Sequence, residues 1–333
     1  MKNILFRWEA ALFLMLVAEL AVFGYVNPRF LNVGNLVYGT SDFVQIGIVA
    51  LPLTLVIIAG GIDVSFASAI GLCAIVFGVS NFFGLPLPLA IGLSLVAGAL
   101  AGLLNATVIH LSKIQPLVVT LGSLYLFQGA ATVLSGVVGA GGYEGIGNFP
   151  ASFTSFGYAE FLGLPAPLAV FLGLAAVLVV LLHFTRFGRA VFLVGQSAEA
   201  ARYSGLSVAT TQTITYVITG VCAAIAGLVM SAYFGSARVD LGASTLLPAV
   251  TAAVLGGASI YGGQGSILGT LLATFVIGYL QQGLQASGVP SQISSALSGG
   301  LLVAAVALRH GSALLADFIA VARQKRNDRA TAS

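Results

Sequence analysis

Residues 195–206, GQSAEAARYSGL, form a short polar stretch between long apolar runs. Its charged side chains, Glu199 and Arg202, stand three residues apart. Ser197 can cap the first amides of a helix, and Gly205 can take the left-handed conformation that ends one. Glu199 would then lie in the first turn, where the positive end of the helix dipole favours a carboxylate. The stretch predicts a helix of about two turns that offers small and charged side chains to a partner.

The other groups that could move protons or hold metals are few. Glu19 lies inside the first apolar run, and Asp63, His110 and His183 lie near the ends of others. Transporters driven by protons or sodium commonly keep such groups deep in the membrane, where each is costly. We interpret these four as snorkelling or capping groups, with a proton relay as the alternative. Three scattered histidines and two cysteines offer no enzyme site.

The chain contains no motif for nucleotide hydrolysis. A phosphate-binding loop needs a lysine after a glycine-rich turn, and none of Lys2, Lys113 and Lys325 has that context. The run GGQGSILG at 262–269 misses the spacing of dinucleotide-binding glycines. We therefore assign no catalytic, cofactor-binding or metal-binding residue to this chain, and the energy for any active transport must enter from a partner.

The elements that position these residues are expected to be membrane helices. Of the 333 residues, 58% are hydrophobic and 7% are charged, against roughly a quarter charged in soluble domains. Most apolar runs are long enough to cross a hydrocarbon core of about 30 Å as helices of about 20 residues, and they lack the alternation of a membrane barrel. The sequence therefore predicts an all-α polytopic membrane protein.

About ten transmembrane helices are expected. Their ranges are 10–25, 43–59, 64–82, 87–110, 117–135, 166–183, 212–234, 245–257, 267–286 and 293–308. The eighth range is short, contains Pro248 and ends at Gly256–Gly257, so it is a candidate for a broken or re-entrant segment.

The distribution of basic residues sets the orientation of these spans. With both termini in the cytoplasm, all of the thirteen Lys and Arg residues except Arg29 and Arg238 fall on the cytoplasmic side. We expect a transmembrane domain over 1–308 with a cytoplasmic loop at 185–211, and a cytoplasmic tail over 309–333.

Glycine is abundant, with 42 residues, and falls into two groups. Gly98 and Gly102 stand four apart in the fourth span, a spacing that lets membrane helices approach closely. Gly60–Gly61, Gly256–Gly257 and Gly262–Gly263 fall at cytoplasmic span ends and are expected to form hinges or turns.

Four stretches, in order, resemble the ribose-type branch of ATP-binding-cassette sugar permeases. They are GGIDVSFASAIG (60–71), QPLVVTLGSLYLFQGAATVLSG (115–136), TRFGRAVFLVGQSAEAARYSGLSV (185–208) and VLGGASIYGGQGSILGT (254–270). The third holds the spacing E-A-A-x-x-x-G, which resembles the cytoplasmic loop signature of bacterial import permeases of this class. The resemblance implies that the short helix sits in a groove of an ATPase subunit. The residues assigned to this coupling are Glu199, Ala200, Ala201, Arg202 and Gly205, with Ala200 and Ala201 expected to offer a flat surface to the partner.

A closer resemblance is to permease subunits that import autoinducer 2, a furanosyl signal molecule. It is carried by TSDFVQIGIVALPLTLVIIAGGIDVSF (40–66), YEGIGNFPASFT (143–154), YFGSARVDLGAS (233–244) and GYLQQGLQASGVPSQISSALSG (278–299). This resemblance implies a bacterial inner-membrane protein that pairs with a sister permease, a cassette ATPase dimer and a periplasmic binding protein. The ATPase, and not this chain, would use ATP and Mg. Autoinducer 2 and a ribose-like sugar both remain open as the substrate.

A polyhydroxylated substrate needs neutral hydrogen-bonding groups along its path, because these avoid the desolvation cost of buried charge. The candidate pathway residues within the spans are Asn105, Thr120, Ser123, Gln128, Gln281, Gln282 and Gln285. Hydrogen bonding between helices is the alternative role for each.

The main alternative function is an ATP-independent secondary carrier or facilitator for a small sugar. The scarcity of intramembrane charge argues against ion coupling but not against passive transport, so energy dependence distinguishes the two functions. Membrane lipid is an expected partner, and nucleic acid is not.

Overall fold

The computed structural model describes residues 2–141 and 144–290, and isolated positions between 293 and 307. Its described side chains begin at Trp8. The expected tail, 309–333, lies outside the described residues, and the expected tenth span, 293–308, is covered by isolated positions only.

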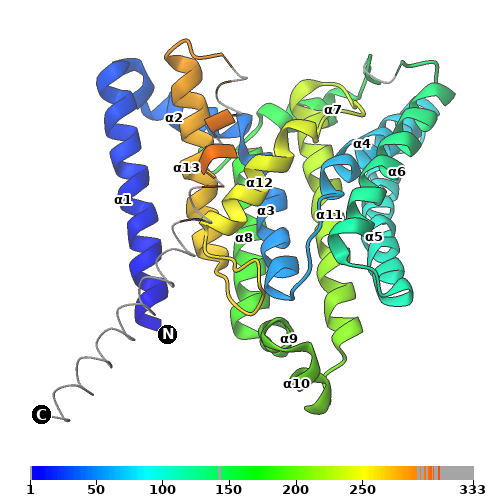
Figure 1. The fold of residues 1–333 in the computed structure, drawn as a ribbon. Coiled ribbons are helices and arrows are strands. Elements are labelled where there is room, and N and C mark those ends of the chain that lie inside the picture. Colours follow the sequence, from blue (N-terminus) through cyan, green and yellow to red (C-terminus); the bar gives the residue numbers. More distant parts are fainter. Residues whose placement is uncertain are drawn as a thin grey trace, which may run out of the picture.

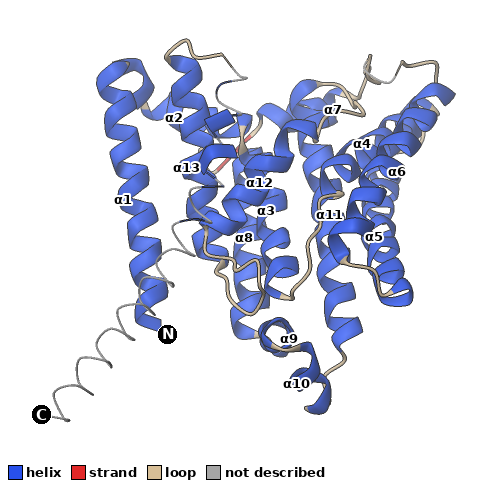
Figure 2. Cartoon of the chain, viewed as in Figure 1, coloured by secondary structure: helices blue, strands red, loops and turns tan. Residues whose placement is uncertain are grey.

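Long apolar helices make up most of the described chain (Figures 1 and 2). Among the described residues, six helices are long and apolar enough to cross a membrane. They are α1 (Lys2–Val26), α5 (Leu87–Ser112), α6 (Pro116–Val137), α8 (Ala166–Phe184), α11 (Val208–Phe234) and α13 (Ile267–Ala286). Each coincides with an expected span, which confirms the prediction of an all-helical polytopic protein.

Three further expected spans are bent or short. α2 (Val33–Gly39) and η2 (Thr40–Asp42) meet α3 (Val44–Ile58) at a bend of 60°, and the pair could form a seventh crossing. α4 (Phe66–Phe82) and α12 (Leu246–Leu255) are apolar but short. The expected eighth span is thus a helix of 10 residues, and a helix needs about 20 to cross the hydrocarbon core. The described residues do not confirm the count of ten.

Short elements complete the described chain. They are η1 (Pro28–Leu31), α7 (Ala151–Thr154), η3 (Ser155–Tyr158), β1 (Glu160–Phe161), β2 (Leu164–Pro165), α9 (Arg186–Gln196), α10 (Ala198–Tyr203) and η4 (Ala243–Thr245). The two strands pair antiparallel, Glu160 with Pro165 and Phe161 with Leu164. Figure 1 places α9 and α10 beyond the lower ends of the long helices, at the same end of the molecule as the start of α1.

Helix α11 is the central element of one half of the molecule, where it packs against α3, α4 and α5. Its contact with α5 is close because glycines face it. A Cβ atom added at Gly98 would lie 2.2 Å from the carbonyl oxygen of Gly220, and one at Gly102 would lie 2.2 Å from that of Tyr216. The expected close approach at these two glycines is confirmed.

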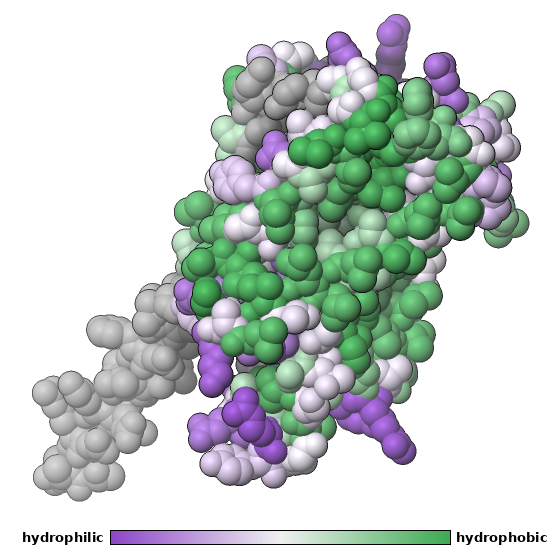
Figure 3. All heavy atoms as spheres, turned by 90° about the vertical axis from the view of Figure 1, so that its right-hand side faces the viewer, coloured by the Kyte–Doolittle hydropathy of each residue, from purple (hydrophilic) through white to green (hydrophobic). Residues whose placement is uncertain are grey.

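The outer surface of the bundle is apolar between two polar ends. Figure 3 shows a broad hydrophobic band on the side of α5 and α6, with hydrophilic residues gathered at the top and bottom. Leu100 on α5 and Tyr125 and Val133 on α6 are exposed within it. Such a band matches the hydrocarbon core of a bilayer, with lipid or another membrane helix replacing water.

Candidate functional site

The loop 185–211 folds into the two short helices α9 and α10. Thr185 caps α9, since its Oγ1 accepts a hydrogen bond from the Gly188 amide at 3.2 Å. Gly188, Val191 and Val194 recur every three residues and are buried, while Arg186 and Arg189 are exposed. This amphipathic pattern holds α9 flat against the ends of the membrane helices.

The predicted polar helix is α10, and its two ends form as the sequence indicates. The Ser197 Oγ accepts from the Ala200 amide at 3.2 Å. At the other end Gly205 has φ +79°, its amide donates to the carbonyl of Arg202 at 3.0 Å, and the Leu206 amide donates to that of Ala201 at 3.0 Å. These two bonds are the Schellman arrangement, in which a left-handed residue closes the last helical turn.

The side chains of α10 divide into an anchoring face and a free face. Ala201 is only 3% exposed and packs with Val194, Val208 and Leu206 of the same chain. The expectation that Ala201 offers a surface to a partner is therefore wrong, because its methyl group anchors α10 to α9 and to the start of α11. The exposed residues of α10 are Ala198, Glu199, Ala200, Arg202 and Tyr203, and Ser204 and Gly205 after the helix are exposed as well.

A buried polar cluster occupies the break between α3 and α4. The Asp63 Oδ1 accepts from both the amide of Ser65, at 2.9 Å, and its hydroxyl, at 2.7 Å. Asn105 of α5 donates from Nδ2 to the Ser65 Oγ at 2.7 Å. These side chains are at most 2% exposed. Asp63 thus holds the turn that precedes α4, and it lies inside the chain rather than at an interface.

Side chains of α6 and α11 satisfy the irregular backbone beside this cluster. The carbonyl of Ile62 accepts from the Thr120 Oγ1 at 3.3 Å and from the Tyr216 hydroxyl at 3.2 Å. The Gln212 Nε2 donates to the carbonyl of Ala59 at 3.0 Å. Non-helical backbone at membrane depth needs such partners, because lipid offers none. Sequence reasoning missed Tyr216 and Gln212; the signal was a polar side chain on each of two successive turns of an apolar helix.

A cavity of about 150 Å³ adjoins the same break, between α3 and α12. Its lining residues are Leu53, Ile57, Ile62, Asp63, Val250, Val254 and Ile260. Asp63 is the sole charged residue of this lining. The Asn105 Oδ1 is buried and has no hydrogen-bond partner within the described structure, so the cluster retains an unused acceptor.

The structure separates the predicted pathway residues into groups. It brings Asn105 and Thr120 together at the break, with Ser123, 5% exposed, one turn beyond Thr120 on α6. Gln128 is exposed on α6. The three glutamines 281, 282 and 285 lie in the last turns of α13, where Gln282 packs against Gly39 at the end of α2. Gln285 is exposed.

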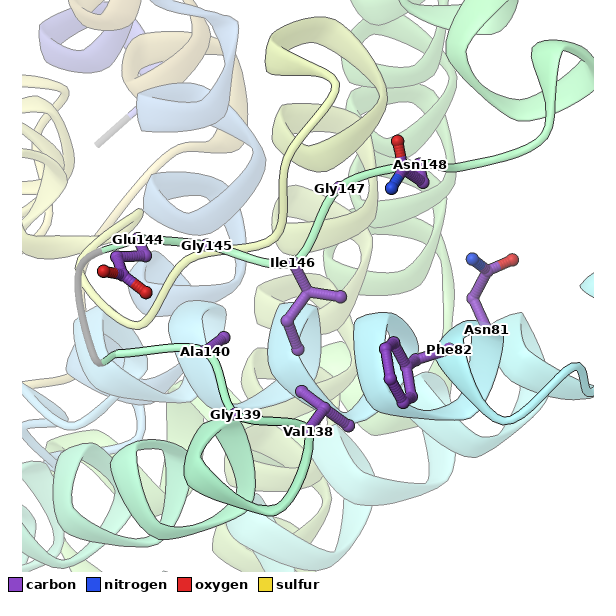
Figure 4. Close-up of a pocket in the computed structure, with 10 residues that line it drawn as sticks. All are labelled: Asn81, Phe82, Val138, Gly139, Ala140, Glu144, Gly145, Ile146, Gly147 and Asn148. Carbon is purple, nitrogen blue, oxygen red and sulfur yellow. The ribbon is translucent and has the colours of Figure 1, made fainter.

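A second hollow of about 360 Å³ lies at the opposite end of the molecule from α10, between the end of α4 and the segment after α6 (Figure 4). Glu144 is its charged lining residue, and its carboxylate accepts from the Gly141 amide at 3.0 Å. Nearby, Arg238 and Asp240 form a salt bridge of 2.6 Å. This pair neutralises one of the two basic residues that the topology placed outside.

Comparison with known proteins identifies the kind of protein that carries these features. The family model described as branched-chain amino acid transport system / permease component matches residues 35–306. An autoinducer 2 import system permease protein LsrD of Escherichia coli (strain K12) is 57% identical over 304 residues, 91% of this chain and 92% of the relative. The LsrD protein of Enterobacter sp. (strain 638) is 58% identical over 300 residues, 90% and 92% of the two chains.

A solved structure shares the fold at low sequence identity. A transporter assigned to the metal-chelate ABC type, in an inward-facing conformation, aligns with a TM-score of 0.50 and 16% identity, and the alignment covers 91% of this chain and 99% of the other. The sequence relatives are transport permeases and not enzymes. The chain therefore belongs to the permease-component family of ATP-binding-cassette import systems that this model describes, and the LsrD permeases are its relatives.

Proposed function

We propose that the chain is the permease subunit that helps to carry autoinducer 2 across the bacterial inner membrane. The substrate assignment rests on the 57% identity, over 91% of the chain, to LsrD proteins of autoinducer 2 import systems. The neutral side chains of Ser65 and Asn105 support a path for a hydroxylated solute, since the Asn105 Oδ1 is a buried acceptor without a partner in the described structure.

The partners of this chain are proposed to be an LsrC-like sister permease, an LsrA-like ATPase dimer and an LsrB-like periplasmic binding protein. The ATPase would use ATP and Mg, and this chain would bind neither. The free face of α10, with Glu199, Ala200 and Arg202, is the surface that a groove of the ATPase would receive. Gly205 fixes the end of that surface, and Ala201 holds it to the rest of the chain.

In the membrane, the proposed arrangement has both termini and the loop 185–211 in the cytoplasm. Ten crossings would include the bent α2–α3 segment and α4, with α12 as a short, broken span and the tenth over 293–308. The permease domain would then extend over 1–308 and the cytoplasmic tail over 309–333. The start of α1 and α10 lie at the same end of the molecule, which supports this orientation.

The mechanism would be alternating access without chemical change. ATP binding would close the ATPase dimer and displace α10, and the two permeases would open in turn to the periplasm and to the cytoplasm. Asn105, Thr120 and Ser123 are proposed to line the path near the α3–α4 break. Gln128, Gln281, Gln282 and Gln285 remain candidates on other surfaces of α6 and α13.

Co-purification tests this assignment against the facilitator alternative. The tagged chain, expressed from its own chromosomal locus and extracted in mild detergent, is expected to bring down a second permease and a cassette ATPase in stable stoichiometry. Mass spectrometry of the purified complex identifies both. A chain that purifies alone, or as a homodimer, and still moves a small sugar into vesicles without ATP would contradict the proposal in favour of the facilitator.

A further inference from the structure

The end of α9 touches two other segments of backbone directly. A Cβ atom added at Gly195 would lie 1.7 Å from the carbonyl oxygen of Ile58, at the end of α3, and 2.5 Å from the amide nitrogen of Gly263. The Gly263 amide donates to the same Ile58 carbonyl at 2.8 Å. Figure 1 shows α9 beneath the lower ends of α3 and of the loop that precedes α13.

The loop 256–266 makes the third side of this contact. Gly262 has φ +83°, and a Cβ atom there would lie 2.6 Å from the carbonyl oxygen of Gly195. The loop is closed on itself by hydrogen bonds from the Ser259 amide to the Gln264 carbonyl, 2.9 Å, and from the Gly262 amide to the Ser259 carbonyl, 2.8 Å. Its geometry is therefore fixed, and only glycine fits at the points of contact.

Both broken membrane segments leave from this contact. On one side, Ile58 leads through Ala59 and Gly60 to the polar cluster at Asp63. On the other side, the loop 256–266 joins α12 to α13, and α1 holds both of its ends. Trp8 donates from Nε1 to the Leu255 carbonyl at 2.8 Å, and Ser266 donates from Oγ to the Glu9 carboxylate at 2.6 Å.

We propose that Gly195, residues 58–60 and the turn Gly262–Gly263 form a rigid transmission joint that moves the α3–α4 and α12–α13 breaks together with the coupling helix. The proposal rests on the proposed function of the loop 185–211. Three backbone segments in direct contact, without intervening side chains, leave no flexible group to absorb a displacement. A movement of α10 would thus reach the Asp63 cluster and the cavity between α3 and α12 at the same time.

Separating the joint surfaces, at Gly195 or at Gly262, should uncouple ATP hydrolysis from uptake. Gly195→Ala and Gly262→Ala each insert a methyl group into the contact from opposite directions. Matched controls are Gly173→Ala, at an exposed position of α8, and Gly84→Ala, which has φ +75°; a Cβ atom at either control position meets no atom within 4 Å. In proteoliposomes that hold the whole importer, we expect each joint variant to lower ATP-driven uptake about ten-fold or more. Co-purification of the ATPase should stay at the wild-type level, since the free face of α10 is unchanged.

The two joint variants should also be non-additive, because both separate the same surfaces. If Gly195→Ala and Gly262→Ala take up substrate as fast as the two control variants, the proposal of a rigid joint is wrong. The proposed function would not be affected by that result. A wild-type importer without ATP-dependent uptake would instead contradict the proposed function itself.

Hydrogen exchange in the wild-type complex tests rigidity even if the variants do not fold. Peptides that cover 192–197 and 259–264 are expected to exchange equally slowly in the nucleotide-free state and in the ATP-trapped state. Faster exchange of the Gly263 amide in one of the two states would show that the contact opens during the cycle, and the proposal would be wrong.

Discussion

Gly205→Val is expected to abolish ATP-driven uptake while the importer still assembles in the membrane. Gly205 closes α10 at φ +79°, a conformation that costs a residue with a Cβ atom about 1 to 2 kcal/mol and a β-branched residue more. Valine would relieve this strain by opening the two hydrogen bonds that Gly205 and Leu206 make to the end of α10. The free face of α10 would then lose its orientation, so ATP hydrolysis should continue without transport.

The matched control for this experiment is Gly163→Val. Gly163 has the same φ of +79°, no atom lies within 4 Å of an added Cβ, and it occupies the hairpin between β1 and β2 rather than the loop 185–211. Its uptake should stay near the wild-type value. ATPase activity and uptake are measured together in proteoliposomes, and equal uptake by the two valine variants would refute a coupling role for the end of α10.

Asp63→Ala is expected to destabilise the folded permease by about 1 to 3 kcal/mol. The change removes the acceptor for the amide and the hydroxyl of Ser65. Both donors are buried, so each would lose its hydrogen-bond partner inside the protein. The Ser65 hydroxyl, which accepts from the Asn105 amide, would no longer be held in place by Asp63. The midpoint of denaturation of the purified complex in detergent measures the loss.

Asp63→Asn separates hydrogen bonding from charge at the same position. The asparagine amide oxygen can still accept both hydrogen bonds from Ser65. The denaturation midpoint of Asp63→Asn should therefore lie closer to that of the wild type than to that of Asp63→Ala. A midpoint for Asp63→Ala equal to that of the wild type would show that this carboxylate does not hold the α3–α4 break.

The sequence predicts those features of the fold whose causes are local. The last long helix, α13, has the expected bounds 267–286, because Ser266 caps its start and the apolar run determines its length. The ends of α10 were predictable for the same reason, since a capping serine and a closing glycine act within a single turn. The burial of Ala201 was not, because it depends on α9 and α11 lying on either side.

The α3–α4 break shows where sequence reasoning stops. The pair Gly60–Gly61 indicated a turn, and Asp63 indicated a cap. Neither revealed that Asn105, Thr120 and Tyr216 would converge on residues 62–65 from three different helices. Such contacts depend on which faces of α5, α6 and α11 meet, and glycine-rich apolar helices offer several faces of similar hydrophobicity.

The contact between Gly195 and the turn Gly262–Gly263 was likewise not predictable from the sequence. The sequence indicated turn material at 262–263, but the partner of that turn is a glycine in a different loop, and backbone contact leaves no side-chain pattern to read. Only the three-dimensional arrangement connects the loop 185–211 with the broken membrane segments.

We propose that a separate ATPase drives transport through this chain, and uptake into sealed vesicles distinguishes this from passive transport. Proteoliposomes containing the chain, its sister permease and the ATPase are supplied with the binding protein and labelled autoinducer 2, with and without ATP inside. We predict accumulation against the gradient only when both ATP and the ATPase are present. Uptake at the same rate without ATP, ending at equal concentrations on the two sides, would show instead that the chain is a passive facilitator.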